Sequence, residues 1–278
     1  APPVSSASGG PVFRSVEPSE SPSRFFPSLD TVLGGSTANT WEVIPSVDRE
    51  MNFAFTVRDN NEGGGQLATD QMRITTSENA GPFKITSQNE TGASWQEGTS
   101  ELITWDVAGT DQSPINTTGI DIYFSSDAGL TFDLILENTP NDGEENIVVP
   151  SVTSSQGRLM IKAHDNIYFD INDAPIEVVS SEFIMSFQES DVSVCLPDNA
   201  TFVMNYTTQL DFDEEVTFAL EGAPEGSSVS FSPTSAIANN TEVTLEISGL
   251  TENMTGLYEM VLTGSSASVS RSVNLKLG

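Results

Sequence analysis

The 278-residue chain has little positive charge and few of the residues that most enzyme sites use. It contains 10 Lys and Arg against 40 Asp and Glu, a formal net charge of -30, and only 1 His and 1 Cys. Such a chain repels phosphate backbones and anionic membrane surfaces, so we expect no nucleic acid as a partner, and because long apolar runs are also missing we expect no membrane insertion. Cations, basic surfaces and high salt are the surroundings that this composition favours.

Two further absences exclude whole classes of site. A zinc site of the HExxH type needs two imidazoles on one helical face, and the single His164 cannot supply them. Cys195 is alone, so no internal disulfide can form, and we expect its thiol to be buried as a small apolar group. No apolar run reaches the roughly 18 residues of a membrane helix, and the N-terminus lacks the features of a signal peptide. We therefore expect a mature protein or an excised fragment.

Short runs that alternate apolar and polar residues recur along the chain, while helical periodicity is scarce. The clearest runs lie at 53–57, 120–124, 216–220, 243–247 and 273–277. Gly and Asn turns separate them at spacings of about 8–12 residues, which is typical of antiparallel sandwiches. The sequence predicts an all-β fold of tandem Ig-like or fibronectin-III-like β-sandwiches.

The pattern divides into three units, at 1–80, 81–179 and 180–278. The last two have the length of complete Ig-like or fibronectin-like sandwiches. The first contains one clear hairpin, which runs from residue 52 to residue 76 through a Gly-rich loop. Two strands cannot enclose a core, so this unit either is incomplete at its N-terminus or packs on the second unit.

Several strings resemble one known architecture. Residues 11–15, 23–29, 41–43 and 53–60 form a first block, and residues 103–109, 122–129, 138–143 and 169–171 form a second. Together they resemble the region downstream of the catalytic domain in secreted reprolysin-like zinc metallopeptidases of Bacteroidota. The strings at 194–197 and 256–258 are similar to the Ig-like domain that follows in that family.

This resemblance implies a secreted, extracellular or outer-surface protein that uses a C-terminal secretion signal, with a first unit that is half of a cadherin-like domain. It implies no catalytic residue here, because the family's zinc motif needs several His residues and this chain has only His164. The implied partner is the catalytic domain of the parent chain. The expected function is therefore that of a non-catalytic accessory region used for spacing, docking or binding to substrate or surface.

Calcium is the one cofactor that the sequence suggests, as a possible structural ion and not a required group. The string at 170–175 resembles the acidic linker between cadherin repeats, which makes Asp170, Asn172 and Asp173 candidate oxygen ligands. Asp59 and Asp70 flank the Gly loop of the predicted hairpin and form a second candidate set. The alternative for both sets is an acidic loop that is simply well solvated.

Two other functions stay open. A carbohydrate-binding or cell-surface adhesion module would contact polysaccharide or extracellular protein through exposed aromatic side chains, for which Trp41, Tyr123 and Tyr168 are the candidates. Core packing is the alternative for each of them. A carboxylate-based hydrolase would need two acids with raised pKa values in one concave pocket. We interpret His164, beside Asp165, as a strand-end histidine bonded to a neighbouring loop.

Overall fold

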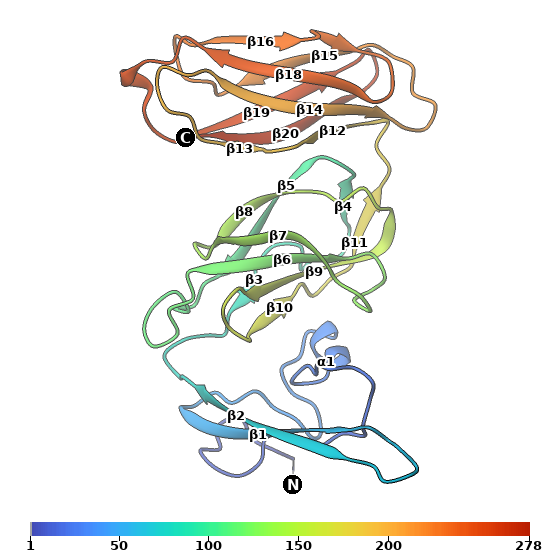
Figure 1. The fold of residues 1–278 in the computed structure, drawn as a ribbon, viewed down its shortest axis with the longest axis vertical. Coiled ribbons are helices and arrows are strands. Elements are labelled where there is room, and N and C mark those ends of the chain that lie inside the picture. The colour runs from blue at the N-terminus through green and yellow to red at the C-terminus, as the bar shows by residue number, and fades with distance from the viewer. Residues whose placement is uncertain (1) are drawn as a thin grey trace.

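A computed structural model describes residues 2–278, and it confirms the predicted all-β class. Strands make up 45% of the chain and helices 3%. Three parts follow one another along the long axis of the molecule, from an N-terminal hairpin at one end to a C-terminal sandwich at the other (Figure 1). Within residues 2–278, no helix is long and apolar enough to cross a bilayer.

The N-terminal part consists of a short helix and the predicted hairpin. Its elements are α1 (Leu29–Leu33), β1 (Arg49–Arg58) and β2 (Leu67–Thr76), and the two strands pair antiparallel without a register shift. The rings of Phe13, Phe26 and Phe53 lie within 5.0–5.9 Å of one another and cover the start of one hairpin face. The far end of that face stays uncovered, with Phe55 and Val57 each 54% exposed.

The middle part is a two-sheet sandwich. Its strands are β3 (Lys84–Ile85), β4 (Ala93–Gln96), β5 (Ser100–Asp106), β6 (Gly119–Ser125), β7 (Asp133–Pro140), β8 (Glu144–Val148), β9 (Ser154–Ala163), β10 (Phe169–Ile171) and β11 (Ile176–Val179). One sheet has the order β4-β11-β9-β6-β7, with β10 beside β9, and the other has the order β3-β5-β8. Trp95 and Trp105 both point into the core between them.

The C-terminal part is a second two-sheet sandwich. Its elements are β12 (Phe183–Phe187), β13 (Asp191–Val192), β14 (Ala200–Thr208), β15 (Val216–Glu221), β16 (Ser228–Ser232), β17 (Ser235–Ala236), β18 (Thr241–Ser248), η1 (Glu252–Met254), β19 (Tyr258–Ser265) and β20 (Ser270–Leu277). In strand order, one sheet is β12-β14-β18-β16 and the other is β13-β20-β19-β15-β17. The expectation that Cys195 is buried is wrong, because the thiol lies exposed in the loop between β13 and β14.

The N-terminal part packs against the middle sandwich, which is one of the two arrangements that the sequence left open. Phe25 meets Phe169 edge to face, with ring centroids 5.2 Å apart. Leu33 of α1 occupies the space beside Gly129, where an added Cβ would lie 2.5 Å from the leucine Cδ2. The segments around Phe25 and α1 show little hydrophobic periodicity in the sequence, and their contacts with the second unit hold them in place.

Charge is unevenly distributed along the long axis. Residues 1–76 carry nine acidic and five basic side chains, a net charge of -4. Residues 77–278 carry 31 acidic and five basic side chains, a net charge of -26. The two sandwiches are therefore strongly acidic, whereas the hairpin end of the molecule carries much less net charge.

Candidate functional sites at the unit junctions

Asn172, one of the predicted calcium ligands, is committed to backbone hydrogen bonds. Its side-chain oxygen accepts from Leu159 N at 2.8 Å, and its amide nitrogen donates to Gln88 O at 2.8 Å and Ala174 O at 2.6 Å. The residue is only 1% exposed. The side-chain oxygen, the atom that would bind a cation, already accepts from Leu159 N, and the three contacts together tie the β9–β11 region to the loop after β3.

The two carboxylates of the same string lie beside a lysine. Asp170 Oδ2 accepts a hydrogen bond from Ile85 N at 2.8 Å, and Asp173 Oδ2 lies 3.8 Å from Lys84 Nζ. Burial raises the pKa of Asp170 to about 6, against the opposing effect of the Ile85 N–H. In the part of the chain from residue 2 to residue 278, no group of three or more His, Cys, Asp or Glu side chains is arranged to hold a metal ion.

Asp59 and Asp70 are separated along the hairpin. Asp59 Oδ1 accepts from Asn61 N and Gln66 N and so closes the Gly loop. Asp70 pairs with Phe55, four positions before Asp59, which places the two acids about 13 Å apart along the strand at 3.3 Å per residue. The two carboxylates therefore cannot share one ion.

The three candidate aromatic side chains come from separate places in the fold. Trp41 is 58% exposed, and the Arg14 guanidinium lies 4.6 Å from its ring centroid. Tyr168 is half-buried, packs on Phe83 at 5.1 Å, and has a buried hydroxyl without a hydrogen-bond partner. Tyr123 is half-buried on β6. Of these three side chains only Trp41 is exposed, so they do not form an exposed aromatic pair on one sheet face.

His164 is hydrogen-bonded to Asp121. Its Nδ1 lies 2.8 Å from Asp121 Oδ1, and this hydrogen bond is the main cause that raises the pKa of His164 above its usual 6.5. Asp121 Oδ1 also accepts from Asn138 N, within the neighbouring strand β7. His164 directly follows β9, as expected of a strand-end histidine, but its partner Asp121 belongs to strand β6 and not to a loop.

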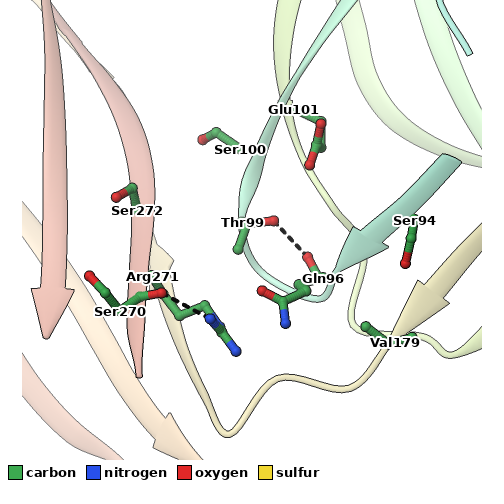
Figure 2. Close-up of a pocket in the computed structure, with 9 residues that line it drawn as sticks. All are labelled: Ser94, Gln96, Thr99, Ser100, Glu101, Val179, Ser270, Arg271 and Ser272. Carbon is green, nitrogen blue, oxygen red and sulfur yellow. Dashed lines mark hydrogen bonds between the residues drawn. The ribbon is translucent and has the colours of Figure 1, made fainter. Parts of the chain in front are cut away.

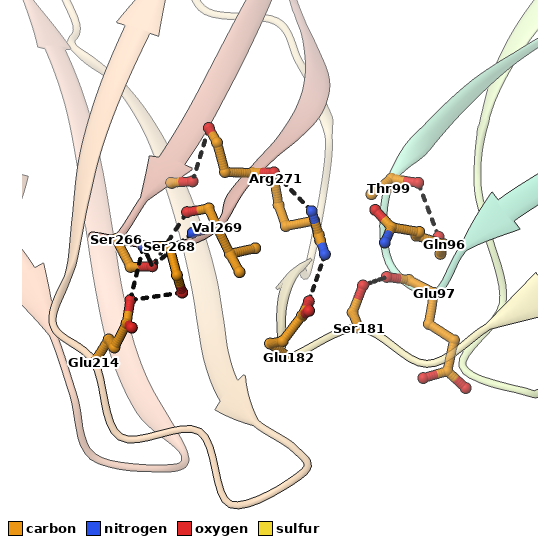
Figure 3. A network of polar contacts seen from close by, with 12 residues as sticks. Gln96, Glu97, Thr99, Ser181, Glu182, Glu214, Ser266, Ser268, Val269 and Arg271 are labelled. Atoms are coloured by element: carbon orange, nitrogen blue, oxygen red, sulfur yellow. Dashed lines mark hydrogen bonds and ion pairs between the residues drawn. The ribbon is translucent and has the colours of Figure 1, made fainter.

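The junction between the two sandwiches is built from specific polar contacts. Ser181 Oγ donates to Glu97 O at 2.7 Å, and Arg271 pairs with Glu182 (Figure 3). Asn274 on β20 donates from its backbone to Ser100 Oγ at 2.8 Å and from its side chain to Asn146 Oδ1 at 2.9 Å. These contacts connect β20 and the 180–182 linker with β5, β8 and the turn after β4.

Charge and close packing add to this junction. Lys276 Nζ lies 2.9 Å from Glu145 Oε1, and this hydrogen bond is the main cause that raises the pKa of Lys276. Gly98 has a φ of +73°, and a Cβ added there would lie 2.5 Å from Ile184 Cγ2. The backbone at Gly98 therefore approaches the C-terminal sandwich more closely than any other residue type would permit.

A shallow hollow of about 460 Å³ opens at this junction (Figure 2). It is lined by hydroxyl, amide and charged side chains of both sandwiches, among them Gln96, Thr99, Glu101 and Arg271. A second hollow of about 420 Å³ lies along residues 86–93. Glu101 is the acid in the first and Glu90 the acid in the second, so neither offers the two carboxylates that a glycoside hydrolase mechanism needs.

No family model and no curated protein matches the chain. Among solved structures it is similar to domains 4 and 5 of the S-layer protein SbsC, at 14% identity and a TM-score of 0.25, over 60% of this chain and 80% of that one. A chimeric titin Z1Z2 tandem matches at 13% identity and a TM-score of 0.23, over 71% of this chain and 100% of that one. E. coli alpha-2-macroglobulin matches at 9% identity and a TM-score of 0.32, over 76% of this chain and 18% of that one. Likenesses at these TM-scores carry no argument about function.

Proposed function

We propose that the chain is a non-catalytic accessory region of a secreted metallopeptidase-like protein, in which it acts as an elongated spacer. The link to such a parent protein rests on the sequence strings described above. The spacer role is supported by the junction of the two sandwiches, where Asn274 bonds Ser100 and Asn146 at once. Hydrogen bonds of this kind need a narrow range of distances and angles, so they favour one relative orientation of the two sandwiches.

Distance measurements between the two sandwiches test the spacer role. The exposed thiol of Cys195 provides one labelling position, and Leu130→Cys provides a second, since Leu130 is 79% exposed in the middle sandwich. We expect pulsed electron paramagnetic resonance to give one narrow distance distribution. A broad distribution, as for two domains on a flexible linker, would contradict the proposal.

Two glycine variants provide the matched comparison. Gly98→Ala places a Cβ 2.5 Å from Ile184 Cγ2 across the junction, and we expect it to broaden the distribution. Gly92→Ala has the same unfavourable positive φ, at +97°, but nothing lies within 4 Å of its Cβ. It should leave the distribution narrow, and equal broadening in both variants would count against a junction that fixes the orientation.

A direct assay addresses the non-catalytic part of the proposal. Purified chain should leave casein intact over long incubation, in the presence or absence of divalent cations. Hydrolysis that a chelator abolishes would overturn this part, because it would require a metal site in the chain itself.

A second candidate function, carbohydrate binding, is favoured by the exposure of Trp41 beneath the Arg14 guanidinium. The other two Trp residues, Trp95 and Trp105, are only 3% and 4% exposed, so a ligand-induced change in indole fluorescence reports on Trp41. Titration with extracellular polysaccharides should shift the emission of the wild type but not of Trp41→Ala. No shift with any polysaccharide would leave spacing as the better-supported function.

A further inference from the structure

The β1 strand has an open edge along its whole length. The hairpin forms a two-stranded sheet, and no other strand among residues 2–278 pairs with either outer edge. At the loop end Asp59 N donates to Gln66 O, so odd-numbered residues of β1 direct their backbone groups toward β2. Because backbone direction alternates in an antiparallel ladder, the even-numbered residues from Glu50 to Arg58 direct theirs outward. All five of them are exposed.

The sequence of β1 is complementary to itself about Ala54. If a second copy pairs antiparallel with residue 54 on the two-fold axis, Phe53 faces Phe55 and Met51 faces Val57 of the other copy. Asn52 then faces Thr56, and Glu50 faces Arg58. In this register, each residue whose backbone groups point outward pairs with another such residue. The backbone N–H and C=O groups of the two β1 strands can therefore hydrogen-bond to each other.

The side chains of the pairing register suit a shared sheet. Phe53, Phe55 and Val57 lie on the apolar face, so pairing would extend this partly uncovered face across two copies. Glu50 and Arg58 lie on the opposite, polar face, where opposite charges on neighbouring strands attract. No acidic side chain within residues 2–278 lies at ion-pair distance from Arg58.

The outer edge of β2 lacks this complementarity. A two-fold axis at Gln71, which pairs with Ala54, would set Thr69 against Arg73 and would place Asp70 beside Met72 on the apolar face. A charge at an apolar position is one of the features that protect sheet edges from pairing. The complementarity is therefore a property of the β1 edge and not of the β2 edge.

Net charge opposes the approach of two copies less at this end of the molecule than at the two sandwiches. β1 and β2 together carry three Arg, at 49, 58 and 73, and two acids, Glu50 and Asp70. The strongly acidic sandwiches lie toward the other end of the long axis (Figure 1), and at physiological salt their mutual repulsion is screened beyond about 8 Å. The hairpin strands thus repel a second copy least, in a chain that is otherwise acidic.

We propose that two copies of this chain pair through the outer edge of β1, antiparallel and centred on Ala54, to form a four-stranded sheet. In this dimer, β1 of the second copy occupies the open edge of β1 and extends the partly uncovered apolar face. The shared surface is small compared with standard protein interfaces, so we expect a weak dimer that forms as concentration rises.

Sedimentation velocity of the full chain, from about 10 μM to about 500 μM, should show a monomer–dimer equilibrium. Glu50→Arg sets like charges opposite each other at two positions and should weaken the dimer by about tenfold or more. The double variant with Glu50→Arg and Arg58→Glu exchanges the two signs and should restore the wild-type affinity. Loss of the exposed Glu50–Arg73 pair, at 3.6 Å, changes folding stability little.

A proline at the centre of the edge provides an independent test. Ala54→Pro removes an outward N–H without touching the β1–β2 ladder, so it should abolish the dimer and keep the strand content seen by circular dichroism. Gln71→Pro removes an outward N–H on the outer edge of β2, together with its bond to Asp70 Oδ1, and should leave the dimer intact. A chain that stays monomeric at every concentration would overturn the proposal. So would a dimer that is unaffected by Ala54→Pro and Glu50→Arg, because copies would then meet elsewhere.

Discussion

Replacement of Asn172 by Asp distinguishes a backbone-binding residue from a calcium ligand. The aspartate keeps the acceptor for Leu159 N but loses both donors, so the carbonyls of Gln88 and Ala174 face a carboxylate. An unmade buried hydrogen bond costs about 1–3 kcal/mol, which gives about 2–6 kcal/mol for the two. For a unit of about 100 residues, we expect the Tm of the middle sandwich to fall by about 10 °C or more.

Differential scanning calorimetry can measure this change as a lower temperature of the transition in which the middle sandwich unfolds. The matched control is Asn116→Asp, which makes the same chemical change at an exposed position and should alter stability by less than about 0.5 kcal/mol. If Asn172 bound calcium, the added charge would strengthen the site, and the variant would melt at or above the wild type in millimolar calcium. That result would refute the assignment of Asn172 to backbone contacts.

Three further predictions concern titration and reactivity. The pKa of Asp170 is raised in the folded state, so its ionisation costs stability as pH rises through the interval from about 4 to about 6. In urea unfolding of the wild type, the free energy of unfolding should fall by at most about 3 kcal/mol over this pH interval. Asp170→Asn should lack this fall, and an equal dependence of the unfolding free energy on pH in both proteins would contradict the prediction. The pKa of His164 is raised, so its pair with Asp121 stabilises the fold below the usual value of 6.5 and loses this effect as pH rises through the folded value. The single histidine resonance should therefore titrate above 6.5, and Asp121→Asn should lower its midpoint. Cys195 should react with a thiol reagent in native buffer, whereas reaction only after unfolding would indicate a buried thiol.

Strands were predictable wherever one face of the sheet is buried. Val243, Leu245 and Ile247 alternate in the sequence, and all three are at most 1% exposed in β18. The hairpin was predictable for a related reason, since its Gly-rich loop separates two strand-like runs. Cys195 was misassigned because the average preference of cysteine for the interior says nothing about a particular loop.

The polar contacts could not be predicted, because their partners lie far apart in the sequence. Asn172 appeared to be a ligand in an acidic string, but its role depends on Gln88, 84 positions earlier. Asn274 lies between two apolar residues of an alternating strand, which is the pattern of a strand residue that faces solvent. Its contact with Ser100 depends on how the two sandwiches meet in the fold. The complementarity of β1 about Ala54 is present in the sequence, but it gains meaning only once the outer edge is known to be open.

The uneven charge along the molecule gives it a large electric dipole moment. The negative pole is at the two sandwiches, with a net charge of -26, and the less charged pole is at the hairpin end, with -4. A negatively charged surface orients the molecule with the hairpin toward the surface and the C-terminal sandwich away from it. Near a positively charged surface the orientation reverses, so the sign of the surroundings selects which end of the chain is presented.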